Sequence, residues 1–286
     1  MFANSPTDAR EGKMLYIVTA LSCEAKPLIS YYKLKSLNNS LSFPVYISDK
    51  ITLIISGVGK ISSASSVSYL QGLYNAQKEL NSWINIGIAG HEHFPIGTGI
   101  LAHKVSDSGS ERSWYPYPPP LFKVPLKSAW IITYDQVTNQ YPKDAAADME
   151  ASGFYSTASR FSTLEFVHCY KIISDNAKNH SKNIHKKAVE NLIEKQMGNI
   201  DSIVSAILSM EEKEKASFCF PKKNHLFLEK WHFTCSERHQ LDNLLKKIYV
   251  CTGEMEIPNR LMESFHKGKE VLQFLEKKLS SLILDV

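Results

Sequence analysis

The sequence lacks any segment that could cross a membrane. Among its 286 residues, no apolar run approaches the ~20 residues that a bilayer-spanning helix needs. Residues 1–13 are polar and contain no apolar core of the kind that a secretory signal peptide carries. We therefore expect a cytoplasmic protein without membrane contact, in which residues 1–13 are a flexible tail or an upstream extension of the natural start.

Cysteine and metal-binding patterns are also sparse. The five cysteines are an odd set without a Cys-x-x-Cys pair, which disfavours a disulfide framework and a zinc site. His91 and His93 form a His-x-His pair, but no third ligand follows at a zinc-like spacing. We expect both to be surface-loop histidines, and the sequence predicts neither a metal nor a cofactor.

Excess charge of one sign is missing as well. The net charge is +4, from 33 basic and 29 acidic residues, whereas nucleic-acid-binding domains usually carry a strong basic patch. Nucleic acid is therefore not an expected partner. The hydrophobic share of 43% and the charged share of 22% are typical of globular proteins. The length fits one large domain, or one domain with an appendage.

What the sequence does contain is a regular alternation of β-rich runs and helix-like stretches. The expected strands are 15–20, 44–47, 51–56, 83–88, 100–106, 129–133 and 168–173. The expected helices between them are 24–34, 61–77 and 149–161. This alternation predicts an α/β fold whose mixed central sheet is covered by helices on both faces. In such sheets, ligands bind at the carboxyl ends of the strands.

Two regions depart from the alternation. Residues 108–120 are rich in proline and aromatic residues, so we expect no regular structure there; they form a surface loop or a flap over a substrate. Beyond 180 helical periodicity dominates, at 185–214, 236–249 and 259–283. We therefore expect an α/β domain at 14–180 and, at 181–286, a helical extension packed on it.

One helix of this extension can be described further. Ser236 is expected to cap the helix that follows it. The helix carries an apolar stripe, formed by Leu241, Leu244, Leu245 and Ile248. The simplest interpretation is that the stripe packs on the α/β domain; an oligomer or partner contact is the alternative.

Polar and glycine-rich residues gather where the expected strands end. The clusters are Ala20–Ala25, Ser56–Lys60, Gly87–Gly90, Asp148–Glu150 and Ser174-Asp175. A single carboxylate at such a position is more often a helix cap or a first-turn residue. Several titratable groups at neighbouring strand ends are instead typical of an active site.

The order and spacing of these clusters resemble the purine nucleoside phosphorylase superfamily, and within it the methylthioadenosine/S-adenosylhomocysteine nucleosidases. The resemblance covers about 14–176. Five motifs of the family carry it: Ala-x-x-x-Glu, matched by Ala20–Glu24; Ser-Gly-Ile-Gly-Lys, by Ser56–Lys60; Asn-x-Gly-x-Ala-Gly, by Asn85–Gly90; Glu-Met-Glu-Ala, by Asp148–Ala151; and Ser-Asp, by Ser174-Asp175. This chain differs from the second motif at Val58 and from the fourth at Asp148. It implies the phosphorylase/hydrolase-like three-layer fold and a homodimer or higher homo-oligomer. The implied activity is cleavage of the N-glycosidic bond of a purine nucleoside, most simply an adenine nucleoside with or without a 5′ modification.

The resemblance also implies roles for individual residues. Asp175 matches the acid that protonates the purine at N7, and Ser174 is placed to orient it. Glu24 matches the base that activates water, and Glu150 matches the ligand of the ribose hydroxyls. The other implied substrate-binding residues are Met149, Gly90, Ala89, Ser56, Gly57 and Lys171. Carboxylic acids suit the cleavage of an N-glycosidic bond, because the sugar becomes cationic while the base must be protonated to leave as a neutral purine.

Some of these assignments have alternatives. Residues 56–60 are equally explained as a strand–helix turn that needs positive φ at glycine. The segment between Thr133 and Asp148 is shorter than in the adenosine-type nucleosidases, in which it supplies contacts to the base. Its nearest candidates for that role are Tyr134, Asp135 and Val137. Lys171 and Ile88 stand where the hydrolases have arginine and serine.

The arginines that hold phosphate in related phosphorylases are missing. Leu21–Glu24 replaces a Gly-Asp-Pro-x-Arg turn, and Asn85 replaces the arginine before the glycine of the third motif. Because a planar guanidinium matches phosphate oxygens, its absence favours hydrolysis. The alternatives are a phosphorylase that uses Lys60 or Lys171, and a non-catalytic nucleoside-binding or scaffold protein.

Overall fold

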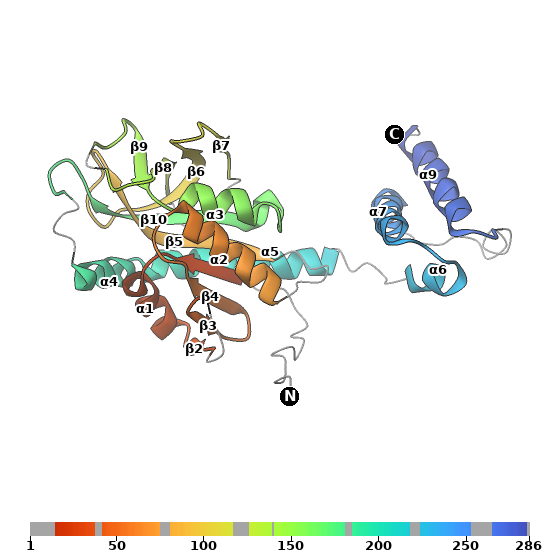
Figure 1. Cartoon of the computed structure of the whole chain (residues 1–286), viewed down its shortest axis with the longest axis horizontal. Helices are drawn as coiled ribbons and strands as arrows, with labels where there is room; N and C mark the ends of the chain where they lie inside the picture. The colour runs from red at the N-terminus through yellow and green to blue at the C-terminus, as the bar shows by residue number, and fades with distance from the viewer. Residues whose placement is uncertain are drawn as a thin grey trace. The chain divides into compact units, whose positions relative to one another are not determined.

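The computed structural model describes residues 15–37, 42–74, 81–116, 126–138, 140–180, 185–217, 224–252 and 265–284 (Figure 1). The chain forms two compact units, of which the first ends at Lys213 and the second begins at Glu214. Residues 186–213, which the sequence analysis assigned to the C-terminal extension, belong to the first unit. The expected tail at 1–13 lies outside the described residues. Within the described ranges, no helix is both long and apolar enough to cross a membrane.

The first unit is built on one mixed sheet. Its strands are β1 (Leu15–Thr19), β2 (Lys35–Ser36), β3 (Val45–Ile47), β4 (Ile51–Ile55), β5 (Ser82–His91), β6 (Gly99–Asp107), β7 (Ser113–Trp114), β8 (Lys127–Thr133), β9 (Ala145–Asp148) and β10 (Val167–Asp175). The strand order is β10-β6-β8-β9-β5-β1-β4-β3-β2, with β7 on β6. A further pairing of β10 with β5 closes five of these strands into a ring, from which β1, β4, β3 and β2 extend.

The central strands are parallel and buried. Strand β1 pairs in parallel with β4 and β5, and β10 pairs in parallel with β5. Every residue of β1 and β4 is buried, as expected for the apolar runs LYIVT and ITLII in a sheet covered on both faces. Because these strands share one direction, the motifs that follow them are brought to one edge of the sheet.

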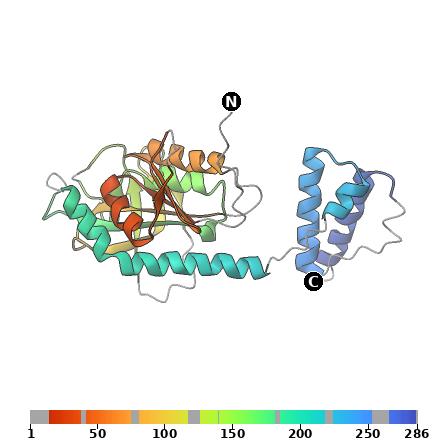
Figure 2. The ribbon, with the colours of Figure 1, turned by 90° about the horizontal axis from the view of Figure 1, so that it is seen from below.

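Helices cover both faces of the sheet. Helices α2 (Lys60–Leu73) and α3 (Ala151–Ala158) share one apolar core with the strands. On the other face lie α1 (Ser22–Tyr31), α4 (Lys186–Lys195) and α5 (Met197–Ser217), which share a second core. Figure 2 shows α2 and α5 on opposite sides of the strands. A 3₁₀ turn, η1 (Leu164–Phe166), leads into β10. The predicted α/β fold with a covered mixed sheet is confirmed.

The second unit has a core of its own. It contains α6 (Asn224–Lys230), α7 (Cys235–Thr252) and α9 (Gly268–Leu284). The predicted apolar stripe of α7 is buried together with residues of α9, namely Val271, Leu272, Leu275 and Leu279. The Trp231 indole N–H also donates a hydrogen bond to the Phe265 carbonyl at 2.9 Å. The stripe therefore serves the packing of the unit itself.

The prediction that Ser236 caps α7 is wrong. Thr234 does so: its hydroxyl accepts the Glu237 N–H at 3.3 Å, and the Glu237 carboxylate accepts the Thr234 N–H at 2.8 Å. This reciprocal pair is a capping box, which needs a hydroxyl residue and a glutamate three positions apart. Thr234 has that spacing, whereas Ser236 is adjacent to Glu237.

The expectation that 108–120 contains no regular structure is wrong at residues 113 and 114. They form β7, which pairs antiparallel with β6. The connecting turn is held by the Asp107 carboxylate, which accepts the Ser110 N–H at 2.8 Å. Residues 117–120 lie outside the described part of the chain, and the flap hypothesis is not addressed by the residues before them.

A buried histidine in β10 makes the stability of the first unit depend on pH. His168 is 1% exposed, and its Nε2 lies 2.9 Å from the Glu165 carbonyl, which requires the Nε2–H tautomer in the neutral ring. Burial lowers the pKa of His168 to about 4, although the carbonyl contact opposes this shift. The unfolded chain, with a histidine pKa near 6.5, therefore takes up this proton first as the pH falls.

We expect the free energy of unfolding to be highest above pH 6.5 and to fall by about 2 kcal/mol between pH 7 and pH 4.5 through this residue. Denaturant unfolding across that range measures the slope. The slope of the free energy of unfolding against pH gives the number of protons taken up on unfolding. In His168→Gln, whose side-chain amide can also donate to the carbonyl, that number should be smaller by up to one. An identical slope in wild type and variant would contradict the assignment.

Candidate active site

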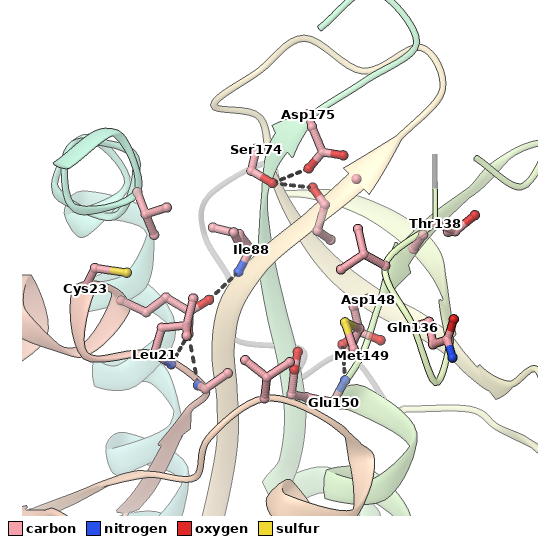
Figure 3. Close-up of a pocket in the computed structure, with 18 of the residues that line it drawn as sticks. Leu21, Cys23, Ile88, Gln136, Thr138, Asp148, Met149, Glu150, Ser174 and Asp175 are labelled. Carbon is pink, nitrogen blue, oxygen red and sulfur yellow. Dashed lines mark hydrogen bonds between the residues drawn. The ribbon is translucent and has the colours of Figure 1, made fainter. Parts of the chain in front are cut away.

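A cavity of about 450 Å³ opens beyond the ends of β1, β5 and β10 (Figure 3). Its size is typical of a small-molecule site. Most of the predicted site residues line it: Glu24, Glu150, Asp175, Ser174, Met149, Gly90 and Ala89. Lys171, Ser56 and Gly57 are not among the residues lining it, but Lys171 and the turn that contains Gly57 support residues that are.

Glu24 is held in place by backbone N–H groups. It lies in the first turn of α1, and its Oε2 accepts the N–H groups of Ala20 and Leu21, each at 2.9 Å. Its Oε1 accepts the Ile88 N–H at 3.0 Å. Burial raises the pKa of the Glu24 carboxyl, opposed by the positive charge of Lys171 and by these N–H donors. The result is an oriented carboxylate with an increased affinity for a proton, as a general base needs.

Lys171 is a buried cation beneath the cavity. Its side chain is 1% exposed, and its Nζ lies 2.9 Å from Asp148 Oδ2 and 3.6 Å from Glu150 Oε2. Burial alone would lower the pKa of Lys171, but the carboxylates of Asp148, Glu150 and Glu24 raise it above its ordinary value. Lys171 therefore stays charged, and its positive charge stabilises the ionised form of the carboxylates around it.

Glycine at position 87 makes this arrangement possible. A Cβ on Gly87 would lie 2.9 Å from Glu24 Oε1 and 3.4 Å from Lys171 Nζ. The backbone of β5 thus passes directly beside the carboxylate and the ammonium group. Asn85, two residues earlier, is buried and donates a hydrogen bond to the Val18 carbonyl at 3.0 Å. At the position where the phosphorylases have arginine, this chain therefore has a residue that bonds to a neighbouring strand.

Glu150 is positioned by the turn between β4 and α2. The Gly59 N–H donates to Glu150 Oε1 at 2.9 Å. Gly57 and Gly59 have φ values of 81° and 101°, as a strand–helix turn that needs glycine requires, and the substrate-binding role of Ser56 and Gly57 stays a prediction. Burial raises the pKa of Glu150, and the charge of Lys171 opposes the shift. The Ser56 hydroxyl donates to the Gly57 carbonyl at 2.8 Å and stabilises the turn.

Asp148, which replaces the first glutamate of the family motif, fixes the start of α3. Its Oδ2 accepts the Ala151 N–H at 2.8 Å, and its Oδ1 accepts the Thr133 hydroxyl at 2.7 Å. The same Oδ2 forms the ion pair with Lys171. Asp148 therefore connects β8, β9, β10 and α3 at one point, and determines where Met149 and Glu150 lie.

Asp175 is held by two hydroxyl groups. Ser174 Oγ donates to Asp175 Oδ1 at 2.5 Å, as the expected orienting role of Ser174 requires. The Tyr141 hydroxyl donates to Asp175 Oδ2 at 2.6 Å. The sequence analysis missed Tyr141, which belongs to the shortened segment between Thr133 and Asp148. A Cβ on Gly90 would collide with the Tyr141 ring and lie 2.7 Å from Asp175 Oδ2, so this glycine permits their contact.

The rest of the shortened segment forms one side of the cavity. Gln136, Val137 and Thr138 line it. Of the three residues proposed to contact the base, Val137 is therefore at the cavity. Asp135 instead pairs with Lys60, its Oδ1 lying 2.8 Å from the Lys60 Nζ.

The expectation that His91 is a surface-loop residue is wrong. It is the last residue of β5 and is 3% exposed. Its Nδ1 accepts the N–H groups of His93 and Phe94 at 3.0 and 3.1 Å, and its ring stacks on Phe94. These contacts make it a structural residue of a tight turn. His93 lies beside Glu92, at 3.2 Å.

The sequence matches no family model and no curated protein, but solved structures share its fold. The 5′-methylthioadenosine/S-adenosylhomocysteine nucleosidase of Campylobacter jejuni is 17% identical, with a TM-score of 0.55 over 68% of this chain and 98% of its own. The apo 5′-methylthioadenosine nucleosidase of Arabidopsis thaliana is 16% identical, with a TM-score of 0.58 over 68% and 96%. The native futalosine hydrolase of Helicobacter pylori is 17% identical, with a TM-score of 0.56 over 68% and 97%. The chain therefore has the fold of these nucleosidases, and the fold implied by its motifs is confirmed.

The buried position of Lys171 leads to a prediction about stability. Replacing one member of a buried ion pair leaves uncompensated charges, which typically costs about 3–5 kcal/mol. We expect Lys171→Met to lose about that much free energy of unfolding, measured by denaturant titration at neutral pH. Lys143→Met, at an exposed position in the same unit, is the matched control, and should change stability by less than about 0.5 kcal/mol. Equal stability of the two variants would show that Lys171 does not hold the carboxylates together.

Proposed function

We propose that this protein hydrolyses the N-glycosidic bond of a purine nucleoside, most simply an adenine nucleoside. The observation that carries the proposal is the convergence of Asp175, Glu24 and Glu150, from three separate elements, on one cavity. The fold supports it, because neighbours of the same fold are nucleosidases and a hydrolase by name. The proposed substrate is a free small molecule, and the proposed assembly is a homo-oligomer.

In the proposed reaction, Asp175 gives its proton to N7 of the base. The C1′–N9 bond then breaks, its electron pair leaves with the neutral purine, and the sugar becomes an oxocarbenium-like cation. Ser174 and Tyr141 hold the two carboxyl oxygens of Asp175 and so fix its direction. This placement puts the base at the end of the cavity formed by Asp175 and Gly90.

Glu24 and Glu150 act on the sugar and the water. Glu150 binds the ribose hydroxyls, and its charge stabilises the cationic sugar, which rests on Met149. Glu24 accepts a proton from water as the water oxygen bonds to C1′. Its raised pKa brings its proton affinity closer to the neutral range, where a general base works best. The products are free base and a sugar with a hydroxyl at C1′.

Hydrolysis is favoured over phosphorolysis because both lysines considered for phosphate are already bound. Lys171 is buried against Asp148 and Glu150. The Nζ of Lys60 lies 2.9 Å from Asp107 and 2.8 Å from Asp135, and these hydrogen bonds, first that to Asp135, raise the pKa of Lys60. A phosphate ion would have to displace carboxylates from each.

The activity can be tested by chromatography of the released base. Adenosine, methylthioadenosine, S-adenosylhomocysteine, inosine and deoxyadenosine are incubated with the protein, with and without phosphate. We expect base release independent of phosphate, and a loss of about 10²–10⁴-fold in Asp175→Asn, the usual contribution of a general acid. Asp49→Asn, in an exposed turn, is the control and should keep full activity. Release only with phosphate would establish a phosphorylase, and binding without release would establish a nucleoside-binding protein.

Tyr141 gives a second test of the same site. Tyr141→Phe keeps the ring beside Gly90 but removes the donor to Asp175. A hydrogen bond to a charged group is worth about 1.5–3 kcal/mol, so we expect kcat to fall by at least about tenfold, while KM changes by less than about twofold. Tyr69→Phe, in α2 and not among the residues that line the cavity, is the matched control. Equal kcat values in both variants would show that Tyr141 does not position Asp175.

A further inference from the structure

We propose that Lys186 selects nucleosides whose 5′ substituent ends in a carboxylate or a phosphate. This inference rests on the proposed function, because it assumes that Asp175 binds the base and Glu150 binds the ribose. It adds the chemical class of the substituent, which neither the motifs nor the fold specifies.

Lys186 lies in the cavity wall formed by α1 and α4. It is the first residue of α4, and it lines the cavity together with Val189, one turn further along the helix. Helices α1 and α4 pack against each other, and α1 contributes Cys23 and Glu24 to the same cavity. Lys186 is exposed, whereas Val189 is buried. The lysine therefore stands where the wall reaches solvent.

The charge of Lys186 is opposite to that of the cavity interior. The other charged residues that line the cavity are buried carboxylates: Glu24, Asp148, Glu150 and Asp175. The buried Lys171 compensates part of their charge from below. An anionic substrate would be repelled by this interior unless a cation met its negative group. Among the described residues that line the cavity, Lys186 is the basic side chain available at its mouth.

The ammonium group of Lys186 is free to bind a ligand because Glu190, the carboxylate best spaced to pair with it, is bound to other lysines. Glu190 lies four residues further along α4, a spacing at which lysine and glutamate often pair. The Glu190 carboxylate instead binds Lys26 at 3.2 Å and Lys187 at 3.1 Å. Within the described ranges, no carboxylate forms an ion pair with Lys186. Its ammonium group is thus left for a ligand in the cavity.

The substrate's own geometry directs its 5′ substituent toward the mouth. The groups assigned to the base and the ribose, Asp175 and Glu150, are each 6% exposed. The part of a bound nucleoside that extends from them to solvent is the 5′ substituent. The exposed part of the lining also includes Val58 and Val137, which are 49% and 68% exposed. An apolar linker fits these side chains, and a terminal anion fits Lys186.

The test compares three adenine nucleosides that differ at the 5′ position. Methylthioadenosine is neutral there, 5′-carboxymethylthioadenosine carries a carboxylate, and adenosine 5′-monophosphate carries a phosphate. The quantity measured is the kcat/KM of each anionic compound relative to that of methylthioadenosine. In Lys186→Gln we expect this ratio to fall by about tenfold, the effect of losing a hydrogen bond between charged groups, and to fall further in Lys186→Glu.

The matched control is Lys195→Gln, an exposed lysine at the end of α4 that does not line the cavity. Its ratios should equal those of the wild type. A larger fall for the carboxylate compound than for the phosphate compound identifies a carboxylate as the preferred group, and the reverse identifies a phosphate. Unchanged ratios in both Lys186 variants would overturn the proposal.

Failure of the proposed function can be distinguished from failure of this inference. If the wild type cleaves none of the compounds, calorimetric titration with the two anionic compounds and methylthioadenosine measures binding instead. Tighter binding of an anionic compound that weakens by about tenfold in Lys186→Gln, but not in Lys195→Gln, supports Lys186 on its own. Equal affinities in the wild type and Lys186→Gln overturn it.

Discussion

The buried ammonium group of Lys171 is the interaction on which the candidate site depends. A cation removed from water is tolerated only when carboxylates surround it, and here they come from the end of β9, the start of α3 and α1. The same carboxylates are bound to the backbone at the starts of α1 and α3. The ion-pair cluster therefore fixes both the helices and the acidic groups that face the cavity. A glycine at position 87 leaves the space that the cluster fills.

This arrangement gives the acidic groups of the cavity different surroundings, as the different tasks proposed for them require. Glu24 and Glu150 share the field of Lys171, and burial raises the pKa of each carboxyl against that field. Asp175 lies at the other end of the cavity, where it is bound by hydroxyl groups from Ser174 and Tyr141. The acid proposed for the base is thus separated from the carboxylates proposed for the sugar and water. The position of each acidic group is determined by the residues that bind it.

The sequence allowed the central strands and the motif residues to be predicted, because their signals are local. Strands β1 and β4 are continuous apolar runs, and the motifs follow them directly. Strand β9 was missed because its sequence, AAAD, has no β-branched or aromatic residue, and its burial comes from neighbours far along the chain. Tyr141 was missed for a related reason: it contacts Asp175 only because the sheet brings β9 beside β5. No spacing in one sequence reveals such a contact.

The C-terminal region shows the same division. The apolar stripe of α7 was predicted correctly from its helical spacing, and a helix was expected at 259–283, but no local pattern shows that this helix, α9, covers the stripe. Helix α4 and residues 197–213 of α5 have periodicity like that of the later helices, yet they belong to the first unit. Amphipathic character predicts that a face is buried, and leaves open which surface buries it.

The most direct test of the account is a crystal structure of the Asp175→Asn variant with methylthioadenosine, which the variant should bind but cleave very slowly. We predict the base against residue 175, the ribose hydroxyls on Glu150, and Glu24 facing C1′ through a water molecule. A nucleoside bound in this cavity with its sugar away from both glutamates, or bound elsewhere on the protein, would contradict the account.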